Sequence, residues 1–287
     1  MEAVLALVVL AATPLLLAAI GELVAERAGV LNLGVEGMLL LGAVGAFSAA
    51  FSTGSTMVGL AAGIGAGMAG AALFGMVALG LAANQTATGL ALTILGLGVS
   101  GLLGEGFVGR TVTPPRGLIG DVDAIVIAAF LLAVITHLVL TRTRLGLRIR
   151  AVGENPDAAE ALGLRVGAIR WGAVLFGGAC AGLGGAYLSL AYTPMWGENM
   201  SAGRGWIAVA LVVFASWRPL RAMLGALIFA AFGLADFYRE TLGITISSQF
   251  VAMAPYLATI LALVLISLAS RRSDAPAALG RSWRPER

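Results

Sequence analysis

The chain contains no lysine, and it has only one cysteine and one histidine. A Walker A loop holds the terminal phosphates of ATP with a lysine, so we expect that this chain does not hydrolyse ATP itself. Cys180 alone excludes an intrachain disulfide, and with His137 it supplies too few ligands for a His/Cys metal site. One histidine also gives poor support for a Ser-His-Asp triad. The sequence therefore predicts no catalytic residue, no metal ligand and no cofactor bound by this chain.

Charge is scarce as well. Only 11% of the 287 residues are charged and 59% are hydrophobic, whereas a soluble domain has about 25% charged residues. Apolar runs close to the ~20 residues that cross a bilayer recur along the whole length. The sequence predicts an all-α, polytopic integral membrane protein with a single transmembrane domain over residues 1–270. No room is left for a soluble catalytic domain.

The apolar runs between breaks predict about nine crossings, within a range of eight to ten. The expected spans are Ala3–Gly21, Val30–Ala50, Met57–Ala82, Thr86–Gly104, Ala124–Leu140, Ile169–Tyr192, Trp206–Trp217, Ala222–Asp236 and Val251–Ser270. At about 1.5 Å per residue, Trp206–Trp217 covers only about 18 Å of a ~30 Å hydrocarbon core. This segment either starts earlier, near Met200, or is a half-span buried in protein.

The arginines are distributed unevenly between the two sides. With the long loop Thr141–Ile169 placed in the cytoplasm, most arginines fall inside: 14 of the 18, against 4 outside. The positive-inside rule therefore assigns the C-terminus to the cytoplasm. The tail 271–287 has five arginines and two prolines, and we expect a disordered arm beside anionic lipid headgroups. The net charge of +3 follows this pattern, so no nucleic-acid partner is predicted.

Small residues repeat at helical spacing in two of the expected spans. Gly59, Gly63, Gly67, Ala71 and Gly75 recur every four residues, and Gly178, Gly182 and Ala186 do the same later. Such faces let neighbouring backbones approach closely. They predict packing seams of a helix bundle, with a sliding surface for alternating access as the alternative.

Polar residues interrupt two of the apolar segments. Asn32 and Glu36 are four apart, on one face of the expected helix, and lipid can satisfy neither side chain. They predict a transport path, which a second polar segment extends with Asn84, Gln85, Thr86, Thr88 and Thr93. Glu36 has an equally weighted alternative as a structural carboxylate bonded to a neighbouring helix. For Glu22 and Glu26, near the inner end of the first span, solvated or Arg27-paired roles are favoured.

The loop Thr141–Ile169 carries a second candidate site. Asn155 is a good helix N-cap, Pro156 suits the first helical position, and Gly163 can end the helix. Asp157 and Glu160 complement the positive end of the helix dipole. A two-turn helix that has no membrane to cross is expected to contact a partner protein.

Four stretches resemble a known family: Glu26–Ala43, Asn84–Thr93, Gly177–Tyr187 and Gly203–Ala210. Together with residues 153–164 they are similar to bacterial ABC-importer permeases of the ribose and branched-chain amino-acid type, in the nucleoside-importer branch. The resemblance implies a multi-pass protein of the bacterial inner membrane that works with an ABC ATPase, a second homologous permease (a heterodimer) and an exported substrate-binding protein. ATP and Mg²⁺ are then used by the partner ATPase. The ATPase-coupling residues implied are Glu154, Asn155, Pro156, Asp157, Ala158, Ala159, Glu160 and Leu162.

The resemblance also implies a nucleoside as substrate, with a simple sugar such as ribose or a branched-chain amino acid as alternatives. A path for a nucleoside should offer amides, hydroxyls and carboxylates to the sugar and aromatic rings to the base. Phe47, Phe107 and Trp196 are the aromatic candidates, although packing roles are favoured for them. Two other classes stay open: a stand-alone secondary transporter or channel, which needs more ionisable residues at depth than Glu36, and a membrane-embedded enzyme, for which catalytic residues are few.

Overall fold

The structure is a computed structural model that describes residues 2–115, 117–118, 122–238 and 274–284, together with residues 253, 257, 260 and 264. In this part of the chain regular structure is helical. The membrane-type helices are α1 (Glu2–Arg27), α2 (Val35–Thr53), α3 (Thr56–Gly75), α4 (Gln85–Gly104), α5 (Ala124–Arg142), α8 (Val166–Tyr187), α9 (Arg204–Phe214) and α10 (Pro219–Tyr238). Single π-helical turns extend α3 over Met76–Gly80 and α8 over Leu188–Tyr192.

Six of these helices, within the described residues, are long and apolar enough to cross a membrane. They are α1 to α5 and α8, and two shorter apolar segments lie in α9 and α10. The expected all-α polytopic architecture is therefore confirmed. The expected span Val251–Ser270 falls, apart from four single positions, outside the described residues.

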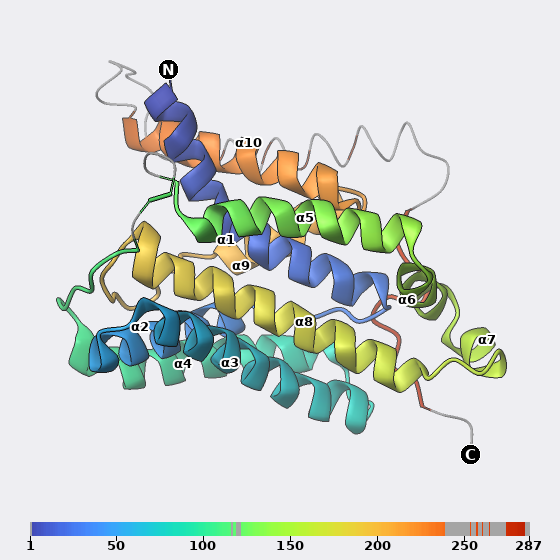
Figure 1. Cartoon of the computed structure of the whole chain (residues 1–287). Helices are drawn as coiled ribbons and strands as arrows, with labels where there is room; N and C mark the ends of the chain where they lie inside the picture. Colours follow the sequence, from blue (N-terminus) through green and yellow to red (C-terminus); the bar gives the residue numbers. More distant parts are fainter. Residues whose placement is uncertain are drawn as a thin grey trace.

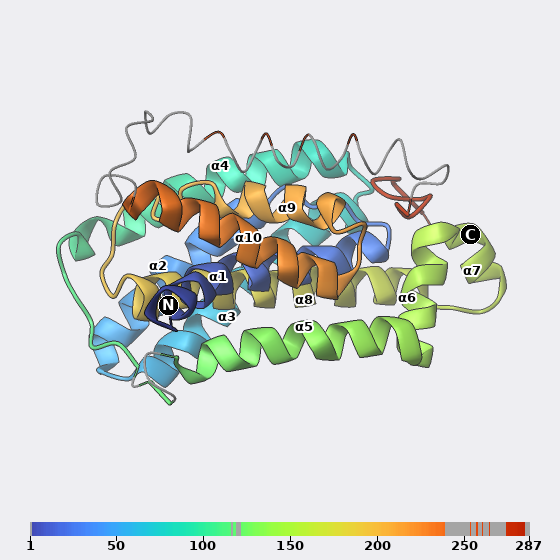
Figure 2. The ribbon, with the colours of Figure 1, turned by 90° about the horizontal axis from the view of Figure 1, so that it is seen from above.

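Helix α8 lies at the centre of the bundle. It runs between α1 on one side and α2 and α3 on the other (Figure 1) and packs closely against all three. Of its most apolar stretch 78% is buried, against 33% in α3, α4 and α5, so α8 is an interior helix and those three are peripheral. Seen from above, α5 lies at one edge and α4 at the opposite edge (Figure 2).

Glycine makes this central packing possible. A Cβ added at Gly67 would lie 2.6 Å from Gly182 Cα, and one added at Gly63 would lie 2.8 Å from Ala186 Cβ. A Cβ at Gly185 would collide with the Leu39 carbonyl oxygen. The two small-residue faces predicted from the sequence therefore form one seam, where α3 meets α8, and their packing role is confirmed.

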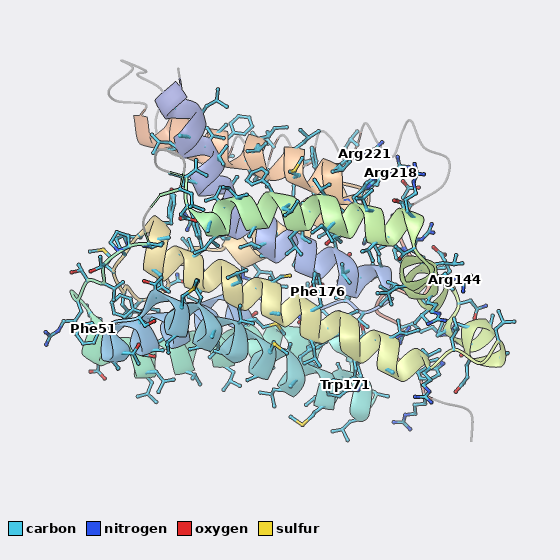
Figure 3. All side chains as sticks on the ribbon, in the orientation of Figure 1. Phe51, Arg144, Trp171, Phe176, Arg218 and Arg221 are labelled. Carbon is cyan, nitrogen blue, oxygen red and sulfur yellow. The ribbon has the colours of Figure 1, made fainter. Side chains whose placement is uncertain are left out.

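The remaining helices, α6 (Arg144–Glu154) and α7 (Pro156–Ala161), project together from one end of the bundle (Figure 1). We call this the α6–α7 end. Arg144, Arg218 and Arg221 lie there, whereas Phe51 lies at the opposite end (Figure 3). The gathering of basic side chains at one end agrees with the sequence-based side assignment.

The C-terminal segment differs from its expectation. Its arginines and prolines predict a disordered arm, but Asp274–Arg284 packs on the α6–α7 end, with Pro276 and Ala278 buried. Two of its anchors join backbone groups: Ala278 N donates to Gly153 O at 2.9 Å, and Gly280 N donates to Gly29 O at 3.3 Å. Because such partners leave no mark in amino-acid composition, the sequence does not predict this packing of residues 274–284.

Candidate functional site

A non-helical segment, Ala28–Gly34, separates α1 from α2 and turns back into the bundle. Leu31 N donates to Gln85 Oε1 at the start of α4 (2.8 Å), and Leu33 O accepts from Thr93 Oγ1 (2.9 Å). Thr93 is eight residues further along α4, which corresponds to a depth of about 12 Å. Ala28–Gly34 is therefore a re-entrant segment, and α2 begins inside the bundle rather than at its end. Irregular backbone at such depth is tolerated only where protein covers it.

Glu36 lies in the first turn of α2, at the inner end of the re-entrant segment. The backbone of Gly37 packs against Gly96, eleven residues into α4, so this level is about 16 Å deep. In a hydrocarbon core of ~30 Å that depth is close to the midplane. Glu36 is 3% exposed.

The Glu36 carboxylate caps a second helix. Its Oε1 accepts from Ser201 Oγ at 2.5 Å and from Gly203 N at 2.9 Å, and its Oε2 accepts from Gly205 N at 2.5 Å. Gly203 and Gly205 stand at the beginning of α9, whose first N–H groups have no partner within the helix. Both carboxylate oxygens are thus occupied in this conformation, as the structural alternative for Glu36 requires.

Two glycines allow this contact. Gly203 has φ +82°, a left-handed conformation that glycine adopts without strain. A Cβ at Gly205 would lie 2.5 Å from the Glu36 backbone and 2.6 Å from Glu36 Oε2. Only a glycine therefore lets the start of α9 approach the carboxylate.

Helix α9 runs from this level to the α6–α7 end, which makes it the half-span anticipated from its length. Its eleven residues cover about 16 Å. Just after its end, Trp217 O accepts from Arg27 Nε at 3.1 Å and from Arg27 Nη2 at 3.0 Å. The N-termini of α2 and α9 therefore meet at mid-depth, and one carboxylate complements the positive end of both helix dipoles.

Two more buried glutamates hold this broken region together. Glu22 Oε1 accepts from Asn32 N at 2.9 Å, and Glu26 Oε2 accepts from Trp217 Nε1 at 2.5 Å. Both side chains are at most 1% exposed. The favoured solvated or Arg27-paired roles were wrong for both. Each instead positions a break in the chain, the re-entrant segment in one case and the α9–α10 turn in the other.

The other predicted path residues divide into two groups. Asn32, Gln85 and Thr93 are buried and bonded to the backbone of the re-entrant segment. Asn84 and Thr86 are exposed at the start of α4, where Asn84 Oδ1 caps the helix through Ala87 N at 2.9 Å. The structure brings Asn32, Glu36, Gln85 and Thr93 together along one segment and leaves Asn84 and Thr86 outside it. Their contact with substrate stays a prediction.

Two surface cavities flank the bundle. One, of about 400 Å³, lies between α3 and α4 and is lined by Thr88 together with apolar side chains. The other, of about 510 Å³, lies between α1, α5, α6 and α8, and Thr136 is the one polar side chain among its lining residues. The aromatic candidates lie in neither cavity: Phe47 and Trp196 are buried in one cluster, and Phe107 packs edge-on against Phe47.

The predicted coupling residues form a capped helix on the α6–α7 end. Asn155 Oδ1 accepts from Ala158 N at 3.0 Å, and Pro156 is the first residue of α7, as the sequence predicted. Leu162, directly after α7, is 84% exposed. Among the eight residues, Glu154, Asn155, Asp157, Ala158 and Leu162 are exposed, Glu160 is half-buried, and Pro156 and Ala159 are buried. The exposed subset defines the face of α7 that a partner can reach.

The sequence does not reveal the structural roles of six residues: Glu22, Glu26, Ser201, Gly203, Gly205 and Trp217. A signal existed for the glutamates, because carboxylates in an apolar helix need partners. Their partners could not be found from the sequence, since Ser201 lies 165 residues from Glu36 and Trp217 lies 191 residues from Glu26.

Comparison with known proteins adds an independent result. Residues 4–270 match the family described as branched-chain amino acid transport system / permease component. The permease protein TsgC13 of Haloferax volcanii, named for glucose transport, is 39% identical over 96% of this chain and 95% of its own length. The guanosine ABC transporter permease protein NupQ of Bacillus subtilis is 31% identical over 94% of this chain and 92% of its own. The nucleoside ABC transporter permease protein NupC of Lactococcus lactis is 43% identical over 48% of this chain and 44% of its own. No solved structure gives a significant match.

Proposed function

We propose that this chain, which belongs to the permease family of branched-chain amino acid transport systems, moves nucleosides into the cytoplasm. It does so as a membrane-spanning subunit of an ATP-driven ABC importer. An exported binding protein delivers the substrate, and a separate ABC ATPase binds and hydrolyses ATP with Mg²⁺. A second, homologous permease completes the membrane pathway as the other half of a heterodimer. The chain itself is a transport subunit.

The main structural support for this proposal is the projecting helix α7 with its exposed Leu162. It is a two-turn helix capped by Asn155, held away from the bundle by the amphipathic α6, and it ends in the exposed side chain of Leu162. An exposed leucine on a short capped helix suits insertion into an apolar groove of a partner protein.

The arginines support the orientation. The α6–α7 end carries Arg144, Arg218 and Arg221 (Figure 3), and the positive-inside rule places such an end in the cytoplasm. The α7 face then projects toward the compartment that holds ATP.

Substrate class is proposed from the relatives. NupQ and NupC are named for guanosine and nucleosides, and TsgC13 for glucose, so a simple sugar is the second candidate. A nucleoside carries a ribose, and both classes present several hydroxyls to a path lined by amides and hydroxyls.

The test is a reconstitution of this chain with its partner permease, ATPase and binding protein in proteoliposomes. We expect nucleosides to stimulate ATP hydrolysis and to accumulate in the compartment that faces the ATPase, opposite the side on which the binding protein delivers them. Stimulation by glucose or ribose without nucleosides would transfer the assignment to sugars. Uptake by this chain alone, without the ATPase, would overturn the importer assignment.

A further inference from the structure

The C-terminal segment Asp274–Arg284 contacts several of the chain breaks at the α6–α7 end. Arg284 Nη2 donates to Leu81 O (3.3 Å) and Ser282 Oγ donates to Ala83 O (3.3 Å), both between α3 and α4. Asp274 pairs with Arg218 at the start of α10 (3.4 Å). A segment of eleven residues therefore bridges parts of the chain that lie far apart in the sequence.

One side of this segment is bound to helix α7 and its neighbours. Trp283 Nε1 donates to Asp157 Oδ1 at 3.1 Å, and the Arg281 guanidinium pairs with Asp157 Oδ2 at 3.4 Å. The Trp283 ring packs on a cluster that includes Ala159 of α7 and Val166 of α8. The two ties to Asp157 and the ring contact join the tail to the proposed ATPase-docking helix.

The other side is bound to the re-entrant segment. Arg281 O accepts from Gln85 Nε2 at 3.3 Å and from Arg170 Nη1 at 3.2 Å. Gln85 also accepts the N–H of Leu31, so one side chain joins the tail to the segment that ends at Glu36. Gly280 N bonds to Gly29 O at the beginning of the same segment.

We propose that Asp274–Arg284 is a second coupling element, which transmits displacement of α7 to the re-entrant segment and so to the meeting point of α2 and α9. The proposal rests on the proposed function. Helix α7 contacts α6 and α8, and α6 in turn packs on the re-entrant segment, where a Cβ added at Gly153 would lie 3.2 Å from Gly29 N. The tail adds a second connection, so movement of α7 also pulls on Gln85 and Gly29 or breaks the contacts of Trp283 and Arg281.

The test is a double variant that removes both polar ties between the tail and Asp157 of α7 and changes little else. Trp283→Phe keeps an aromatic ring and removes the N–H donor, and Arg281→Gln removes the ion pair but keeps the backbone carbonyl bound by Gln85 and Arg170. The control Arg148→Gln removes the same charge from an exposed arginine on α6. We measure assembly with the ATPase, thermal unfolding, and ATP hydrolysed per substrate imported in proteoliposomes.

We expect assembly and unfolding to match the wild type and the control, while ATP hydrolysed per substrate imported rises roughly two- to thirtyfold, the range of coupling carried by such contact networks. An unchanged ratio would overturn the proposal. Hydrolysis and import that fall together with the amount of folded protein would also overturn it, because the tail would then be a structural clamp only. A separate experiment tests the proposed function itself. If Leu162→Ala assembles with the ATPase as the wild type does, α7 is not the ATPase-docking helix, whatever the tail variant shows.

Discussion

At the residue scale, the carboxylate of Glu36 is defined by three donors from one helix start. A carboxylate in an apolar helix was open to two interpretations, one in the substrate path and one in the structure. The bonds from Ser201, Gly203 and Gly205 support the structural one, because they use both oxygens and leave none directed to an open cavity. We therefore expect Glu36 to act on transport by positioning α9 rather than by binding substrate.

Glu36→Gln should therefore destabilise the protein rather than selectively impair transport. An amide offers one acceptor oxygen, so at least one buried N–H at the start of α9 loses its partner, at a cost of about 1–3 kcal/mol. The measurement is thermal unfolding in detergent, with Glu198→Gln, an exposed carboxylate in the same loop, as the control that should not change. If Glu36→Gln unfolds at the wild-type temperature but no longer imports substrate, Glu36 contacts the substrate rather than only positioning α9.

Single residues show how far sequence reasoning reaches. Asn155 and Pro156 were placed correctly because a helix cap involves residues three apart. Gly67 and Gly182 were recognised because their period is local, although their pairing was not visible. The partners of Glu22, Glu26 and Glu36 could not be predicted, since each contact depends on how distant helices pack.

At the element scale, close backbone packing on α3 and on α2 sets the position of the central helix α8. On the α2 side, a Cβ added at Gly185 would lie 2.7 Å from Ala43 N. Gly172, on the same helix, has nothing within 4 Å of an added Cβ. The two glycines therefore offer a matched pair for separating packing from helix propensity.

Gly185→Ala should lower the free energy of unfolding by about 1–3 kcal/mol, because backbone atoms cannot yield to the new methyl group. Gly172→Ala should be neutral or stabilising by up to about 1 kcal/mol, since alanine favours the helix. Both are measured by thermal unfolding of the purified chain. Equal changes in stability for Gly185→Ala and Gly172→Ala would show that the packing of α8 on α2 does not depend on a glycine at position 185.

Helix α7 is the element on which we expect the ATPase contact to depend. Leu162→Ala shortens the side chain of a residue that is 84% exposed. Its burial against the ATPase should contribute about 1.5 kcal/mol or more, so we expect about tenfold weaker association with the ATPase. Ala159 is unsuitable for this test, because it is buried beneath Trp283 and its replacement would disturb the fold. Arg165→Ala, an exposed site beyond α7, is the control, and association is measured by co-purification over a range of salt concentrations. Equal retention of the ATPase by Leu162→Ala and wild type would remove α7 from the interface.

Elements also show where prediction from sequence stops. The apolar runs predicted the positions of the helices well, and the shortness of Trp206–Trp217 indicated a half-span, now α9. The run Val30–Ala50 gave no sign that its first residues are re-entrant, because Val30, Leu31 and Leu33 are as apolar as a helix would be. Backbone direction there depends on bonds to Gln85 and Thr93, which belong to another helix.

At the scale of the whole molecule, the two ends of the bundle differ in charge. The α6–α7 end carries the proposed docking helix α7, the tail and the starts of the re-entrant segment and α4. The opposite end carries the C-terminal turn of α2, where Phe51 is exposed (Figure 3). An importer that is driven from inside the cell requires the α6–α7 end to face the cytoplasm, which makes orientation the premise of every proposal above.

Single cysteines at Ser52 and Arg150 test that premise directly. Both residues are exposed, one at the end of α2 and the other on α6, and Cys180→Ala supplies a background without thiols. An impermeant thiol reagent added to intact cells should label Ser52→Cys and leave Arg150→Cys unlabelled, because the 14-to-4 arginine asymmetry places α6 inside. After permeabilisation both cysteines should react, which shows that each is accessible. Labelling of Arg150→Cys in intact cells would invert the protein in the membrane, and α7 could then no longer meet an ATPase on the cytoplasmic side.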